Sequence, residues 1–301
     1  MDRRPFIKKL SFGASLAFLS SGQLISSSLK NEKFSLNYAP HFGMFENSAG
    51  SDLIDQIYFM SEMGFKAFED NSMKSRNLST QNKISKALQN KEMSMGVFVA
   101  HRIYWDKPNL TSGDLGYQEE FLKDIKDSVE VAKRVNAKWM TVVPGLLDQR
   151  KNLSYQTANV IETLKRASDI LEPHNLVMVL EPLNFRDHPG LFLSRSPQAY
   201  QICKSVNSPS CKILFDIYHQ QIQEGNLIPN IESCWDQIGY FQIGDNPGRK
   251  EPLTGEINYS NVFKFIKNKN YSGILGMEHG NSIPGIEGEK ALIEAYRAVD
   301  Y

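Results

Sequence analysis

Short apolar segments and longer amphipathic segments alternate from residue 33 to the end of the chain. The short ones are rich in β-branched and aromatic residues, which predicts strands. Residues 176–180 are apolar at every position, as is typical of a parallel strand buried on both faces. The predicted strands are residues 34–38, 65–68, 95–100, 139–143, 176–180, 212–215, 239–243 and 274–277.

The longer segments have the spacing of helices that bury one face. Residues 117–135 and 154–171 are the clearest examples. The apolar faces that we expect to be buried are Phe121, Ile125, Val129 and Ala132 in the first, and Ile161, Leu164, Ala167 and Leu171 in the second.

Eight strands alternating with helices over roughly 270 residues match the size of a single (β/α)8 barrel, an α/β fold. A doubly wound open sheet is the alternative, but no glycine-rich phosphate-binding loop follows the first strand. We therefore expect one TIM barrel domain over residues 29–301.

Composition excludes some classes of function. The chain has 301 residues and a formal net charge of zero, so it has no overall basic field to hold nucleic acid. The three cysteines, Cys203, Cys211 and Cys234, lack the spacing of a zinc site and are odd in number, so core thiols are expected.

Residues 1–28 have the pattern of an export signal. Arg3 and Arg4 precede a weakly apolar run from Leu10 to Ile25, which is too short and too polar to favour a membrane span. The arginine pair resembles a twin-arginine signal, although Asp2 stands where that pattern has Ser or Thr. It predicts use of the twin-arginine export machinery and a periplasmic location, with membrane tethering if the signal is not cleaved. A disordered basic tail is the alternative.

Polar residues end four consecutive predicted strands. They are Glu181, Asp216, Gln242 and Glu278, separated by about one strand–helix unit each. Any one carboxylate at a strand end is more often a helix cap or a solvated turn. In a barrel, however, these four would meet at the same rim, where functional residues lie. Three carboxylates and one amide oxygen suit a hard divalent cation such as Mg²⁺ or Mn²⁺.

Residues 240–259 combine a strand, a turn and a charged loop. The turn is Asp245-Asn-Pro-Gly248, and the loop after it includes Arg249, Lys250 and Glu251. A solvated connector could look the same. The segment, together with Glu181-Pro-Leu-Asn184, residues 215–220 and Gly276-Met-Glu278, resembles the hydroxypyruvate isomerase family of the xylose isomerase-like barrels.

The resemblance implies particular roles for site residues. It implies that Glu181 and Glu278 are the catalytic acid–base pair, and that Glu181, Asp216, Gln242 and Glu278 surround a divalent metal. It further implies that His219 and Arg249 contact substrate oxygens. Gln242 replaces a histidine of the related epimerases, which favours the isomerase branch, whereas the export signal departs from the cytosolic members.

The expected chemistry is proton transfer between adjacent carbons of an α-hydroxy carbonyl compound through an enediolate, with the two glutamates as acid and base. The substrate would be a small hydroxy-aldehyde or hydroxy-ketone of the hydroxypyruvate and tartronate semialdehyde type. Alternatives are an exported ketose epimerase, a non-catalytic sugar-binding protein and, least favoured, an endonuclease. His41, His101 and Glu69 are further candidates to line the pocket. The substrate, the metal and the oligomeric state stay open.

Overall fold

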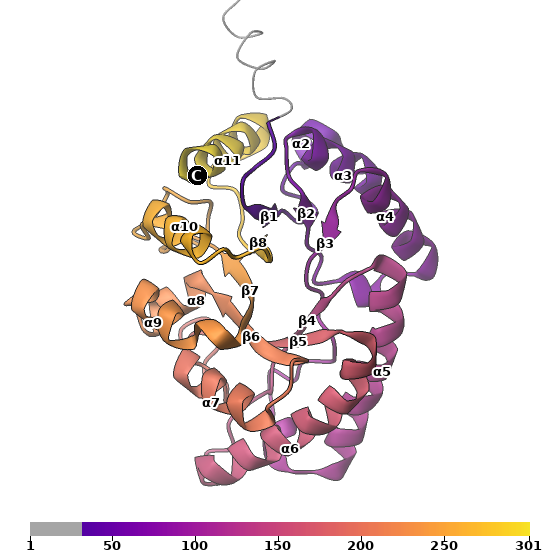
Figure 1. The fold of residues 1–301 in the computed structure, drawn as a ribbon, viewed down its shortest axis with the longest axis vertical. Helices are drawn as coiled ribbons and strands as arrows, with labels where there is room; N and C mark the ends of the chain where they lie inside the picture. Colours follow the sequence, from indigo (N-terminus) through magenta and orange to yellow (C-terminus); the bar gives the residue numbers. More distant parts are fainter. Residues whose placement is uncertain (1–31) are drawn as a thin grey trace, which may run out of the picture.

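A ring of parallel strands surrounded by helices forms the protein (Figure 1). The computed structural model describes residues 32–301, so the predicted export signal lies outside the described residues. Within them the strands are β1 (Asn37–Ala39), β2 (Ala67–Phe68), β3 (Ser94–Met95), β4 (Trp139–Val142), β5 (Val177–Leu180), β6 (Cys211–Asp216), β7 (Ile238–Ile243) and β8 (Ile274–Met277).

The helices lie outside this ring. They are α2 (Glu46–Ala49), α3 (Leu53–Glu62), α4 (Leu78–Asn90), α5 (Leu115–Val135), α6 (Leu153–Leu171), α7 (Ser196–Val206), α8 (Ile217–Gln223), α9 (Leu227–Cys234), α10 (Tyr259–Asn268) and α11 (Gly285–Val299). Short 3₁₀ helices are η1 (Met73–Ser75), η2 (Leu110–Ser112), η3 (Glu172–His174) and η4 (Trp235–Gln237).

Backbone hydrogen bonds join the strands into a closed barrel. Six strands pair in the order β1-β8-β7-β6-β5-β4, and β2 pairs with β3. The amide of Thr141 in β4 donates to the carbonyl of Phe98 (2.8 Å), and that of Glu69 donates to the carbonyl of Pro40 (3.0 Å). These contacts link the two sheets on both sides. The predicted TIM barrel is therefore confirmed.

Alternation along the strands separates two hydrophobic layers. Val179, Leu214 and Tyr240 belong to a small inner cluster, whereas their neighbours Met178, Phe215 and Phe241 pack in the larger layer under the helices. Successive side chains of a strand point to opposite faces. Residues two positions beyond the inner ones therefore point into the barrel at its carboxyl end.

The helix predictions hold with one difference. The four expected residues of α5 are buried, as are Leu164, Ala167 and Leu171 of α6. Ile161, however, is only partly buried, and Val160 takes its place. The 160, 164, 167, 171 series follows helical spacing better, so the expected stripe was wrong by one position at its start.

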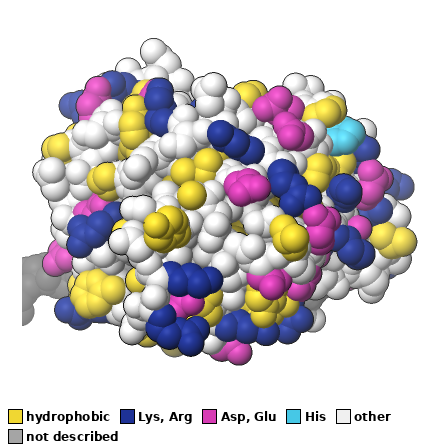
Figure 2. Space-filling model, turned by 90° about the horizontal axis from the view of Figure 1, so that it is seen from below, with side chains coloured by type: hydrophobic (Ala, Val, Ile, Leu, Met, Phe, Trp, Pro, Cys, Tyr) yellow, Lys and Arg dark blue, Asp and Glu magenta, His cyan; other side chains and the backbone are white. Residues whose placement is uncertain are grey.

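The outer surface of the described region mixes both signs of charge. Lysine and arginine side chains are interspersed with aspartate and glutamate on the face in Figure 2. Among residues 32–301 no helix has the length and apolar character that crossing a membrane requires. The three cysteines are buried free thiols, as predicted.

Candidate active site

The four polar residues expected at the rim lie at the carboxyl ends of β5 to β8. Asp216 in β6 pairs in register with Gln242 in β7, and Gln242 pairs with Gly276 in β8, two residues before Glu278. Each polar residue follows an inward-facing position by two, so period-two alternation directs all four into the barrel mouth. Asp216 and Gln242 are almost fully buried there.

Asp216 is both a helix cap and a site residue. Its Oδ1 accepts hydrogen bonds from the amides of Tyr218 (2.8 Å) and His219 (3.2 Å), which caps α8. Its Oδ2 faces the site, 3.1 Å from an Arg249 nitrogen. The capping interpretation is therefore correct for one oxygen, while the other faces the site and pairs with Arg249.

Arg249 lies between two carboxylates. Its Nη2 is 3.1 Å from Asp216 Oδ2 and 2.7 Å from Glu278 Oε2, while its Nε donates to the Glu278 carbonyl (3.0 Å). The guanidinium also covers the ring of Tyr218, 4.9 Å from its centroid. A positive charge thus occupies the space that these carboxylates enclose.

The loop that carries Arg249 is organised around a buried aspartate. Asp245 accepts hydrogen bonds from the amides of Asn246 (2.9 Å), Gly255 (2.9 Å) and Ile257 (3.1 Å). A second buried acid, Glu251, accepts hydrogen bonds from the amide (2.9 Å) and hydroxyl of Ser282 in the loop after β8. Hydrogen bonds to two buried carboxylates therefore hold this loop in place, and it is not a solvated connector.

His219 presents a hydrogen-bond donor to the site. Its Nδ1 accepts from the amide (3.3 Å) and the side-chain nitrogen (2.7 Å) of Asn184. The orientation of Asn184 is fixed because its Oδ1 accepts from the amides of Arg186 and Asp187, both at 2.9 Å. Burial lowers the pKa of His219 to about 4, so the ring is neutral at pH 7 and its single proton lies on Nε2.

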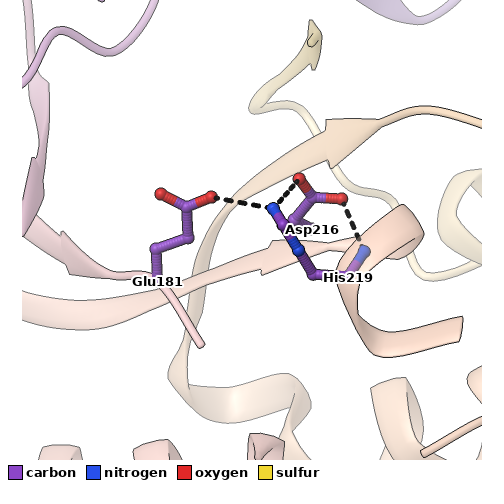
Figure 3. Close-up of side chains that lie close together, drawn as sticks. All are labelled: Glu181, Asp216 and His219. Atoms are coloured by element: carbon purple, nitrogen blue, oxygen red, sulfur yellow. Dashed lines mark hydrogen bonds and ion pairs between the residues drawn. The ribbon is translucent and has the colours of Figure 1, made fainter. Parts of the chain in front are cut away.

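Nε2 of His219 points at two carboxylates (Figure 3). It lies 3.6 Å from Asp216 Oδ2 and 4.0 Å from Glu181 Oε1. It has no hydrogen-bond partner within residues 32–301. A substrate oxygen placed among these three groups would therefore receive its hydrogen bond.

The three glutamates of the site favour protonation. Burial, followed by the nearby Glu278 and Asp216 carboxylates, raises the pKa of Glu181 well above its ordinary value. Burial also raises the pKa of Glu278 to about 7, although Arg249 opposes the rise, and that of Glu69 to about 8. Groups with a pKa near neutrality can both take and give a proton.

The three further candidates have different positions. His41 and Glu69 line a cavity of about 340 Å³ that also reaches Glu278. His101 is buried below the rim, where its Nδ1 bonds to the Arg102 carbonyl (2.9 Å) and its Nε2 accepts from the Val143 amide (3.2 Å). Both ring nitrogens of His101 therefore make hydrogen bonds to the backbone, which is a structural role.

Two asparagines of the site were not expected from the sequence. Asn71 donates to Glu278 Oε1 (2.8 Å), opposite the oxygen that Arg249 holds, and Asn184 orients His219. Both follow a strand end by a few residues, Asn71 after β2 and Asn184 after β5. Inspection of three or four positions beyond each strand, instead of the first, could have found them.

The donor set fits a divalent cation. One ligand atom each from Glu181, Asp216 and His219 lies within 4.8 Å of the others. Gln242 adds a buried Oε1 that has no hydrogen-bond partner in the described part of the chain. Since His219 carries its proton on Nε2, the oxygens of Glu181, Asp216 and Gln242 are better suited to a hard cation than this imidazole.

Comparison with known proteins gives a family. The family model described as xylose isomerase-like TIM barrel matches residues 57–299. Hydroxypyruvate isomerase of Escherichia coli is 35% identical over 164 residues, which are 54% of this chain and 64% of that protein. A 2-oxo-tetronate isomerase of Cupriavidus necator is 32% identical over 164 residues, 54% of this chain and 63% of its own.

These matches span less than two thirds of either relative. Among solved structures, an AP endonuclease of family 2 from Brucella melitensis superposes with a TM-score of 0.74 over 88% of this chain and 100% of that chain, at 22% identity. Identity at that level supports the fold and says nothing of the reaction.

Proposed function

Because the chain belongs to the xylose isomerase-like TIM barrel family, we propose that it is a metal-dependent isomerase of a small hydroxy-carbonyl compound. The substrate class is that of hydroxypyruvate and tartronate semialdehyde. The similarity to hydroxypyruvate and 2-oxo-tetronate isomerases supports this class.

One observation carries the proposal. Glu181 and Glu278 have raised pKa values and point into the same barrel mouth from β5 and β8, which are separated in the sheet by β6 and β7. A substrate between them therefore has a carboxylate on either side. Binding alone does not require such a pair, whereas moving a proton between neighbouring carbons does.

The residues divide the work as follows. One glutamate removes the proton from the hydroxyl-bearing carbon, and the electron pair of that C–H bond forms the double bond of an enediolate. The other glutamate returns a proton to the former carbonyl carbon, while the hydroxyl proton moves to the oxygen that becomes the new alcohol. His219 Nε2–H and Arg249 hold the two oxygens.

Glu181, Asp216, Gln242 and Glu278 would hold the cation. Bound Mg²⁺ or Mn²⁺ would supply positive charge near the oxygens on which negative charge develops. Arg249 places positive charge between Asp216 and Glu278, and this arrangement supports the proposal that these carboxylates attract a cation.

The test is proton exchange in variants of the two glutamates. Solvent deuterium incorporation into hydroxypyruvate, tartronate semialdehyde and 2-oxo-tetronate would be followed by NMR with Mn²⁺ or Mg²⁺ present. Glu181→Gln and Glu278→Gln keep an oxygen ligand but cannot act as bases, so each should lose about 10²–10⁴-fold in exchange. The double variant should be little worse than either single one, since both groups serve one cycle.

Two results would count against the proposal. Undiminished exchange in both single variants would assign proton transfer to other residues. If the metal-loaded protein exchanges no candidate substrate yet binds it, the sugar-binding alternative takes its place.

A second candidate, an epimerase or related enzyme of an uncharged ketose, is favoured by the charges at the mouth. Hydroxypyruvate carries a carboxylate that needs a cation, but Arg249 is paired with Asp216 and Glu278. Arg76 in the adjacent cavity is likewise paired with Asp70 through two hydrogen bonds of 2.5 and 3.1 Å. Faster exchange with free ketoses than with the carboxylate substrates would select this candidate.

We also propose that the protein is exported through the twin-arginine pathway. Arg3 and Arg4 before a weakly apolar run support this. Replacing both by lysine should leave the protein in the cytoplasm of a bacterial host, as fractionation would show. Unchanged export of that variant would refute the proposal.

A further inference from the structure

Glu69 is buried beneath the site and contacts Gln242. Its Oε1 accepts a hydrogen bond from Gln242 Nε2 (2.9 Å), and its Oε2 accepts one from the hydroxyl of Tyr240 (2.7 Å). Glu69 follows β2, on the side of the barrel opposite β6, and is 2% exposed.

The direction of this hydrogen-bond chain is set by the backbone. The amide of Val97, which can only donate, points at the Tyr240 oxygen (3.4 Å). Tyr240 has one proton and gives it to Glu69. In the ionised carboxylate Oε1 can only accept, and it does so from an N–H of Gln242. The carbonyl oxygen of that amide must then point the other way, and it is the atom that finds no partner among residues 32–301.

Two glycines make room for the chain. A Cβ on Gly276 of β8 would overlap the Glu69 carboxylate. A Cβ on Gly96 would lie 2.4 Å from the Tyr240 hydroxyl oxygen and 3.1 Å from the Phe68 carbonyl oxygen. The interior at this level therefore accommodates a buried acid instead of the apolar side chains found one layer below.

We propose that Glu69 is a positioning residue that fixes the Gln242 amide with its oxygen toward the cation site. This inference rests on the metal site of the proposed function. A glutamine side chain can present either an oxygen or an NH₂ group, and only the oxygen can ligate a divalent cation. In its ionised form Glu69 removes the wrong orientation, because it accepts from Gln242 and has no proton to offer to the amide oxygen.

The experiment measures metal affinity instead of turnover. Mn²⁺ binding to the full chain would be titrated by electron paramagnetic resonance for the wild type, Glu69→Gln and Gly276→Ala. Residues that orient a metal ligand typically contribute 10–100-fold to affinity. Both variants should weaken Mn²⁺ binding by about that factor. Gly276→Ala is informative because it displaces the carboxylate while keeping its charge.

A double-mutant cycle separates orientation from charge. In a Gln242→Ala background no amide remains to be oriented, so adding Glu69→Gln should change Mn²⁺ affinity by less than about twofold if Glu69 acts through Gln242. If Glu69→Gln weakens binding equally in both backgrounds, Glu69 acts through its charge alone and the proposal is wrong. Unchanged affinity in the single variant overturns it as well.

Thermal melting curves recorded by circular dichroism serve as the control that each variant folds. Should Gly276→Ala fail to fold, Tyr240→Phe keeps both the charge and the glycine and removes one anchor of Glu69, and it should also weaken Mn²⁺ binding. A wild-type protein that isomerises its substrate but binds no stoichiometric metal would refute this inference and the metal dependence, while leaving the isomerase activity itself standing. Stoichiometric metal binding without any isomerisation would refute the isomerase proposal and leave this inference standing.

Discussion

At the scale of single residues, hydrogen-bond direction decides what the site can do. Asn184 accepts from two backbone amides and donates to His219, whose Nε2 then offers a proton. By distance alone, Glu181, Asp216 and His219 form a possible set of metal ligands. Distance, however, does not distinguish a hydrogen-bond donor from an acceptor. The proton on Nε2 supports the proposal that His219 binds the substrate.

Replacing His219 by asparagine tests this assignment. Asparagine can still accept from Asn184, as Nδ1 does, but ends short of Nε2. A lost hydrogen bond to substrate is worth about 1–3 kcal/mol, so kcat/KM should fall about 5–150-fold. If His219 binds substrate and does not ligate the metal, Mn²⁺ affinity should stay within about threefold. A loss of metal affinity of tenfold or more would show that His219 ligates the cation.

At the scale of elements, the sequence predicts the strands better than the site. All eight expected strands overlap observed ones, since β-rich runs bounded by turns have few other uses in an alternating chain. Glu181 and Glu278 could be placed at the rim for the same reason. Asn71 and Asn184 could not, because they lie in loops whose course depends on contacts across the barrel. Nor does the sequence reveal that Arg249 lies between two acids.

The loop of residues 245–257 depends on one buried carboxylate. Asp245→Asn replaces one oxygen by an NH₂ group that must face a backbone N–H. An unsatisfied buried donor costs about 1–3 kcal/mol, so the urea midpoint should fall and activity should decline with it as Arg249 loses its support. Limited proteolysis should gain a cleavage site in this loop. Thr254→Ala, which removes only a hydroxyl bond to the Glu251 carbonyl, is the matched control and should leave the midpoint nearly unchanged.

At the scale of the whole molecule, buried neutral histidines make the barrel sensitive to acid. Burial lowers the pKa of His101 to about 4, against an ordinary value of 6.5. Between these values the unfolded chain binds a proton that the folded chain does not. The free energy of unfolding therefore decreases as the pH falls from 6.5 to 4.

Urea unfolding at pH 6.5, 5.5 and 4.5, with chelator present, would measure this effect. One such histidine contributes up to about 1.4 kcal/mol per pH unit. His101→Gln keeps an acceptor for the Val143 amide but does not titrate, so its unfolding free energy should change less steeply with pH by about that amount. Equal slopes for the two proteins would show that His101 is not the responsible group.

Arg249 has a consequence for the speed of binding. Its backbone is fixed on both sides, because its amide donates to the Asp245 carbonyl (2.9 Å) and its carbonyl accepts from the Gly280 amide (3.1 Å). A ligand that replaces the guanidinium between Asp216 and Glu278 therefore needs the loss of two ion pairs and the rotation of one side chain, but no opening of the loop over microseconds or longer. We expect hydrogen exchange of the amides of residues 245–257 to be the same with and without Mn²⁺. Entry to the barrel would then be limited by diffusional encounter and not by a gate.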